Sequence, residues 1–144
     1  VLTHGTAGDA MIRTLARNTP TVVLAHTPIE GCDTVTVENS ESSAALTTHL
    51  LEHGRARLVF AGDPETSHDI RARYAGFVAA LDDAGLAEAM PPLRVWFEES
   101  SAPEIVELLL AAGDTVDGVV CANDELALAT MTLLRRRGVS VPDD

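Results

Sequence analysis

Short apolar runs alternate along the chain with longer segments in which apolar residues recur at helical spacing. Each apolar run is bounded by Gly, Pro or polar residues, which predicts a buried strand. These strands are expected at residues 1–3, 21–25, 34–37, 57–61, 93–97 and 119–122. Helices are expected at residues 9–18, 40–53, 103–112 and 124–137, with another whose stripe runs from Ile70 to Leu81 before Gly85. The pattern therefore predicts one helix between most pairs of successive strands.

Several positions refine these helices. Met11, Ile12 and Leu15 are expected to form the buried face of the first helix. Ser40 is a candidate cap for the second. Strands that alternate with helices of 10–15 residues predict βαβ units and a mostly parallel sheet covered on both faces. The fold class is therefore α/β, a Rossmann-like parallel sheet flanked by helices, and ligands bind such sheets at the carboxyl ends of the strands.

Composition and charge narrow the possible functions. The chain has 144 residues and a formal net charge of −12, and a surface this acidic repels nucleic-acid phosphates. No apolar run approaches the ~18 residues of a membrane helix, and no signal peptide is visible at the start. The chain lacks a starting Met, so we expect a fragment or a processed form. Cys32 and Cys121 stand alone in the sequence and are expected to be buried free thiols.

Polar residues follow the predicted strands at the edge where ligands bind. Asn123 and Asp124 come directly after the strand at 119–122, and they either contact a ligand or only cap the next helix. The strand at 57–61 is followed by a polar loop that ends at Asp69. Arg73 lies about one turn into its helix, near the same edge. Its planar guanidinium suits a pair of hydroxyls or a carboxylate, although a surface salt bridge is the alternative.

Catalytic patterns are weak or missing. His49 and His53 are four residues apart, but without an HExxH pattern a solvated helix face explains them better than zinc. The loop at residues 5–8 lacks the glycine pattern of a phosphate loop, and no GxSxG marks a nucleophile. Asp63 has no supporting acidic cluster. The arginines at 135–137 suit the negative end of a helix dipole better than a nucleic-acid patch. The sequence thus favours a binding protein without metal or cofactor over an enzyme.

Three motifs in order resemble the lactose-repressor (LacI/GalR) family of transcriptional regulators. The stretch Arg73-Tyr74-Ala75-Gly76-Phe77, with Ala80-Leu81 and Ala84-Gly85-Leu86, resembles that family's RxxGFxxALxxAGL pattern. Ala122-Asn123-Asp124 with Ala127-Leu128 and the ending RGVSVPDD resemble its AND-x-x-AL … GLxVPxD pattern. Val37-Glu38-Asn39 resembles its VDN crossover between lobes. The resemblance covers essentially the whole chain.

The resemblance implies a two-lobed, periplasmic-binding-protein-like (type I) fold with an effector between the lobes. Residues 1–37 would be the end of the N-terminal lobe, and residues 38–144 most of the C-terminal lobe, without its last strands. The family's effector contacts map to Arg73, Asn123 and Glu38, and the strand ends add Asp124 and Asp69. Glu38 departs from the usual Asp, which places its carboxylate about one methylene further out.

The resemblance also implies a function. The chain would sense a small polar effector, most commonly a sugar, and thereby control DNA binding by a helix-turn-helix that these 144 residues do not include. Such regulators are cytoplasmic homodimers, with Leu128 near the subunit contact. The alternative is the substrate-binding protein of an ABC sugar transporter, which shares the fold. The third hypothesis is an enzyme with a similar sheet, but the sequence shows no set of catalytic residues that would support it.

Overall fold

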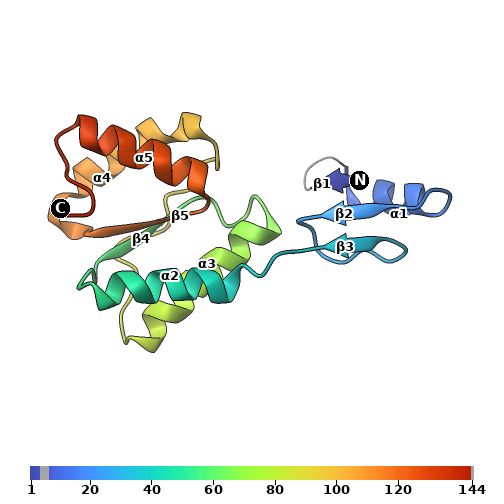
Figure 1. Cartoon of the computed structure of the whole chain (residues 1–144), viewed down its shortest axis with the longest axis horizontal. Helices are drawn as coiled ribbons and strands as arrows, with labels where there is room; N and C mark the ends of the chain where they lie inside the picture. The colour runs from blue at the N-terminus through green and yellow to red at the C-terminus, as the bar shows by residue number, and fades with distance from the viewer. Residues whose placement is uncertain (4–6, 144) are drawn as a thin grey trace.

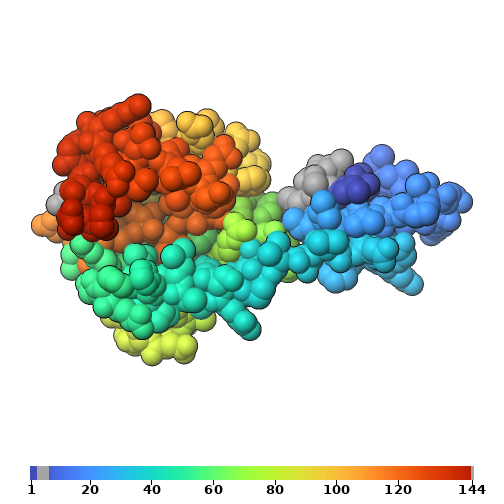
Figure 2. All heavy atoms as spheres, viewed as in Figure 1, coloured from blue at the N-terminus to red at the C-terminus, as the bar shows by residue number. Residues whose placement is uncertain are grey.

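The computed structural model describes residues 1–3 and 7–143, and it divides into two bodies that meet at the segment between β3 and α2 (Figure 1). The first body contains β1 (Leu2–Thr3), α1 (Asp9–Ala16), β2 (Val22–Leu24) and β3 (Asp33–Val35). Its strands pair in parallel in the order β1-β2-β3. A small core of Ile12, Val23 and Ile29 lies between α1 and this sheet. The space-filling view shows that this body is the smaller of the two (Figure 2).

The second body begins with α2 (Ser40–Glu52), β4 (Leu58–Ala61) and α3 (His68–Asp83). It continues through the short 3-10 helix η1 (Glu99–Ser101), α4 (Ala102–Ala112), η2 (Gly113–Thr115), β5 (Gly118–Cys121) and α5 (Asp124–Arg136). Strands β4 and β5 pair in parallel, from Leu58 opposite Gly118 to Ala61 opposite Cys121. The helices α2 and α3 cover one face of these strands, and α4 and α5 cover the other (Figure 1).

This three-layer arrangement follows from the apolar strands. All residues of β4 are buried, because alternate side chains enter different cores on the two faces of the sheet. Leu58 and Phe60 pack with Phe77 and Leu81 of α3. Val59 and Ala61 face the other side, where Ile105 of α4 and Leu126 of α5 cover them. The parallel α/β fold predicted from the sequence is thus confirmed, and the division into lobes stays a prediction.

The strand predicted at 93–97 is wrong. Leu93 forms only an isolated bridge with Ala61, although its N–H donates to Phe60 O at 2.8 Å and its carbonyl accepts from Gly62 N at 2.9 Å. The segment therefore lies beside β4 without becoming a regular strand. Val95 N donates back to Leu93 O at 2.9 Å, and this tight local turn interrupts the ladder, although Val95 O accepts from Asp63 N at 3.2 Å.

Two expectations for the helices are also corrected. In α1 only Ile12 is buried, whereas Met11 is 60% and Leu15 41% exposed, so the predicted apolar face is not covered in this structure. In α2, Ser40 is the first helical residue and Asn39 occupies the N-cap position. Residues 4–6, which include the first half of the loop at residues 5–8 considered above as a phosphate loop, lie outside the described residues, as does Asp144. Among the described residues, no helix has the length and apolar character needed to cross a membrane.

Candidate ligand-binding site

A close contact between α2 and α3 brings Arg73 to the start of α2. Gly76 lies against the first turn of α2, and a Cβ atom on it would meet Ser40 O at 2.0 Å and Ser40 C at 2.8 Å. Only a residue without a side chain permits this approach. Since Arg73 lies one turn before Gly76, the same contact places its side chain beside Asn39, the residue before Ser40. The spacing of Arg and Gly in the motif therefore has a geometric role.

Arg73 joins two elements of the second body through hydrogen bonds. Its Nε donates to Asn39 Oδ1 at 2.8 Å, and its Nη1 donates to the carbonyl of Ala122 in a very short contact. Ala122 follows β5 directly, so the guanidinium lies at the carboxyl end of the sheet, as predicted. Nη2 has no hydrogen-bond partner within residues 1–3 and 7–143. Two N–H donors of this half-buried cation are thus open to a further hydrogen bond.

Both the oxygen and the nitrogen of the Asn123 amide bind protein groups. Its Oδ1 accepts from Leu126 N at 2.9 Å, which caps α5, and its Nδ2 donates to Phe97 O at 2.7 Å. The capping alternative raised from the sequence is therefore present in the structure. The second bond ties the loop after Val95 to the end of β5. A ligand contact by Asn123 is compatible with this geometry only through the remaining lone pair and N–H of the amide.

Glu38 caps α2 although it lies one residue before the N-cap position. Its Oε1 accepts from Glu41 N at 2.6 Å, and its Oε2 accepts from Ser42 N and Ser42 Oγ, both at 2.9 Å. These backbone hydrogen bonds hold the pKa of the exposed Glu38 carboxyl below its usual value. The longer side chain, which departs from the family's usual Asp, reaches the first turn of its own helix.

The other predicted carboxylates lie on the first turns of two helices. Asp69 is four residues before Arg73 on α3, so the two share a face of that helix. Its Oδ1 is buried without a hydrogen-bond partner among the described residues. Asp124 is exposed on the first turn of α5. Across residues 1–3 and 7–143, no ion pair joins Glu38, Asp69 or Asp124 to Arg73. Arg73 is linked to the segment of Asn123 through the carbonyl of Ala122.

The aromatic side chains Tyr74 and Trp96 differ in how much of their ring surface is open to a ligand. Tyr74 packs against Phe60 and Phe77, and its hydroxyl donates to Glu88 Oε1 at 2.7 Å. Burial, reinforced by the hydrogen bond and charge of Glu88, raises the pKa of Tyr74 to about 12. The ring of Tyr74 is therefore packed against the core, and its hydroxyl already has a hydrogen-bond partner. Trp96 is 65% exposed and offers an open ring surface.

The polar loop after β4 is held by a single arginine. Arg94 Nη1 lies 2.9 Å from both Asp63 Oδ1 and Glu65 Oε1, and the two carboxylates raise the pKa of Arg94. These pairs are largely exposed, so each contributes little to stability. They do fix the loop to the segment beside β4. Asp63 is thus a structural partner of Arg94, in line with the absence of a phosphoacceptor pattern.

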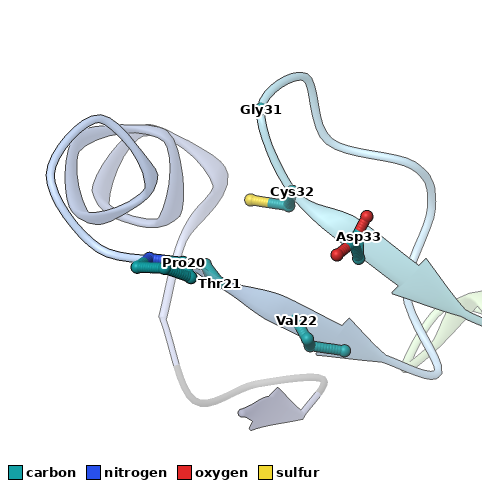
Figure 3. A pocket seen from close by; sticks show the side chains of 6 residues that line it. All are labelled: Pro20, Thr21, Val22, Gly31, Cys32 and Asp33. Atoms are coloured by element: carbon teal, nitrogen blue, oxygen red, sulfur yellow. The ribbon is translucent and has the colours of Figure 1, made fainter.

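Two hollows lie away from this edge. One of about 350 Å³ lies at the amino ends of β2 and β3, where Pro20, Cys32 and Asp33 line it (Figure 3). It is at the opposite end of the strands from the predicted ligand edge. The other, of about 710 Å³, lies between η1 and α5 and is lined in part by Leu128 and Leu133. Leu128 is 58% exposed there.

Metal and nucleophile chemistry has no support in the described part of the chain. No group of three or more His, Cys, Asp or Glu residues there could hold a metal ion. His49 and His53 lie ring to ring at 4.2 Å, and a ring nitrogen of His53 contacts His49 O at 2.8 Å. Burial raises the pKa of the Cys121 thiol to about 12, which keeps it protonated and unreactive.

The arginines at the end of α5 bind nearby protein groups. Arg135 Nη2 donates to Val141 O at 2.9 Å, and Arg137 pairs closely with Glu107 of α4. Arg55 Nη2 also donates to Pro142 O at 2.7 Å. These bonds fold the segment after α5 back onto the body and agree with a structural role at the helix end.

The parallel sheet, with its candidate binding residues at the carboxyl end, is the architecture of ligand-binding α/β proteins. Residues 47–144 match the family model described as a periplasmic binding protein-like domain. The chain belongs to this family, within the effector-binding domains of LacI/GalR-type regulators.

Sequence similarity to named regulators supports this family membership. The chain is 30% identical over 142 residues to the transcriptional repressor PurR of Aliivibrio salmonicida, covering 94% of this chain and 42% of that protein. It is 26% identical over 140 residues to the regulator GalR of Escherichia coli, covering 94% and 40%. The chain thus spans about two fifths of the length of these relatives.

Solved structures agree with the sequence relatives. A LacI family regulator from Enterococcus faecium with bound ribose superposes with a TM-score of 0.85 at 27% identity, covering 99% of this chain and 54% of that one. A putative LacI family regulator from Sanguibacter keddieii is 38% identical with a TM-score of 0.73, covering 87% and 48%. The relatives named here are regulators, not enzymes.

Proposed function

We propose that this chain binds a small polar effector, a sugar in the first instance, and thereby controls DNA binding by a transcriptional regulator. The observation that carries the proposal is the state of Arg73 at the carboxyl end of β5. Two of its nitrogens are held by protein oxygens, and Nη2 has no partner within residues 1–3 and 7–143. A fixed guanidinium with free donors suits vicinal hydroxyls or a carboxylate.

Two further observations support a sugar. The structural relative from Enterococcus faecium contains bound ribose. Asp69 keeps a buried carboxylate oxygen that has no donor in the part of the chain that the structure describes, and a sugar hydroxyl would supply one. Glu38, Asn123 and Asp124 complete the proposed effector set at the ends of α2 and α5. The set combines donors and acceptors, as polyol recognition requires.

The proposed mechanism is a shift between two conformations. Residues 1–37 and 38–144 would belong to two lobes, and an effector that contacts both would favour the closed state. Closure then changes the affinity of a homodimer for operator DNA through the coupling of the two sites. We place Leu128 at the subunit contact, operator binding on a helix-turn-helix segment, and the protein in the cytoplasm. The effector is released unchanged, so no turnover is expected.

Effector binding and DNA release by the full-length protein test this proposal together. Calorimetry against pentoses, hexoses, sugar acids and purine bases should identify a compound that also changes operator affinity. Arg73→Ala should weaken its binding by roughly 2 kcal/mol or more, since a charged hydrogen bond is lost. Arg71→Ala, an exposed arginine on the same helix, is the matched control and should leave the affinity unchanged. Equal affinities of both variants would overturn the role of Arg73.

The operator measurement separates this function from uptake. The substrate-binding protein of an ABC transporter would bind a sugar but would not respond with a change in DNA affinity. The named relatives are transcriptional regulators, which supports the regulatory function. If the protein bound a sugar without any change in its affinity for DNA, the transporter function would be favoured over the regulatory function.

A further inference from the structure

Asn39 is nearly fully buried, at 7% exposure, in the connection between the two bodies. Although it stands at the N-cap position of α2, its side chain makes no capping hydrogen bond. Glu38 satisfies the free N–H groups of Glu41 and Ser42 instead. The amide of Asn39 therefore does not cap the helix, which is the role that Asn usually has at this position.

That amide makes two other hydrogen bonds. Its Oδ1 accepts from Arg73 Nε at 2.8 Å, and its Nδ2 donates to Val37 O at 3.1 Å. The assignment of oxygen and nitrogen is consistent, because the opposite orientation would set an NH2 group against the Nε–H of Arg73 and an oxygen against a carbonyl. Asn39 thus connects Arg73 to the backbone of the connecting segment.

We propose that Asn39 is the positioning residue of the effector site: it fixes the guanidinium of Arg73 so that Nη2 points to the ligand. This inference rests on the proposed effector role of Arg73. An arginine side chain has several rotatable bonds and loses about 2 kcal/mol of rotamer entropy when it is fixed. Asn39 and the Ala122 carbonyl hold it from two sides before any ligand arrives. Such prior fixing lowers the cost of binding.

Variants at position 39 test whether Asn39 positions the Arg73 guanidinium or only stabilises the fold. Asn39→Ala removes both hydrogen bonds, whereas Asn39→Asp keeps a charged acceptor for Arg73 and replaces the donation to Val37 by a carboxylate oxygen against that carbonyl. If Asn39 acts through Arg73, the aspartate variant should bind the probe nearly as well as the unmodified protein. If the bond to Val37 were what matters, the aspartate and alanine variants would fail alike, and the proposal would be overturned.

The first probe is D-ribose, the pentose found in the structural relative, titrated calorimetrically into the full-length protein. Asn39→Ala should weaken its binding about tenfold or more, as expected for the loss of a hydrogen bond to a charged group. In an Arg73→Ala background the same change should cost less than about twofold, because its partner is already gone. A full tenfold loss in that background would show that Asn39 does not act through Arg73.

A second readout does not depend on the probe. The Nε–H proton of Arg73 should be protected from exchange in nitrogen-15 NMR spectra of the unmodified protein and of Asn39→Asp, and should lose its protection in Asn39→Ala. Unchanged protection in Asn39→Ala would overturn the proposal even if D-ribose does not bind. If Arg73→Ala binds D-ribose normally, the effector role of Arg73 fails. If only Asn39→Ala binds it normally, the positioning role fails and the proposed function stands.

Discussion

Gly76 of α3 and Ser40 of α2 lie backbone to backbone, so that a Cβ atom on Gly76 would be 2.0 Å from Ser40 O. The contact fixes the distance between the two helices on this face of the sheet. It also determines whether Arg73, one turn earlier, can reach Asn39. A glycine that serves packing thus also controls the geometry of the candidate binding edge.

Gly76→Ala should destabilise the protein by about 2 to 3 kcal/mol, because the methyl group forces the helices apart. Urea unfolding followed by circular dichroism measures this loss. Ala75→Ser, at an exposed neighbouring position of α3, is the control and should stay within about 0.5 kcal/mol of the unmodified protein. Equal unfolding midpoints for the two variants would contradict the tight contact.

Asn123→Ala should cost more stability than the loss of an ordinary helix cap. The change removes the cap on Leu126 N and also the donation to Phe97 O. Ser67→Ala removes only the cap on Ile70 N at the start of α3, so it is the comparison variant. We expect about 1 kcal/mol for Ser67→Ala and about 2 kcal/mol for Asn123→Ala from chemical unfolding. Equal losses would mean that the bond to Phe97 contributes nothing.

Tyr74 is the only tyrosine in the sequence, so its ionisation can be followed directly by ultraviolet absorbance. The phenol should titrate with a pKa of about 12 in the folded protein, above its ordinary value of 10.0, and near that value in urea. The folded state holds the proton more tightly. Its contribution to stability is therefore complete below pH 10 and is lost as the pH rises towards 12.

Tyr74→Phe provides the control for that titration. The variant should show no absorbance change in this pH range, and its stability should lose the alkaline dependence assigned to the phenol. It also removes the Tyr74 donor from Glu88 Oε1, while Oε2 is already buried without a partner among the described residues. A folded-state pKa near 10 in the unmodified protein would contradict both the burial of the phenol and its bond to Glu88.

Glu38 should make the stability of the protein depend on acid pH. Its pKa is lowered below the ordinary value of 4.5 by the hydrogen bonds from Glu41 N and Ser42 N. A carboxylate with a lowered folded-state pKa stabilises the protein above pH 4.5, and this stabilisation disappears as the pH falls through the folded-state value. Unfolding in urea between pH 7 and pH 3 should therefore show a smaller loss for Glu38→Gln than for the unmodified protein. Parallel curves would contradict a capping role.

Periodicity in the sequence predicted most elements of the fold. The stripe from Ile70 to Leu81 is buried against β4 as expected, and β5 and α5 follow each other directly. The failure at residues 93–97 has a local cause. An apolar run indicates burial, which Leu93 and Val95 do show, but it does not reveal the backbone turn that ends the pairing with β4.

The motifs also identified Arg73 and the edge of the sheet where it lies, because strand ends and helix starts can be located along a chain. They did not reveal the partner of Arg73. Asn39 is 34 positions away, and its approach depends on how two helices pack at Gly76. The sequence named Asn39 only as part of the Val37-Glu38-Asn39 motif, and it placed the helix cap at Ser40.

The sequence by itself therefore determined the order of strands and helices, since burial and hydrogen bonding impose a period on each element. Only the tertiary structure decided which polar groups are left for a ligand. Asn123 and Glu38 are residue types that often bind ligands, yet both cap helices here. Arg73 has no partner at Nη2 among the described residues. Hydrogen bonds between distant segments make this difference, and they depend on distances that no local pattern encodes.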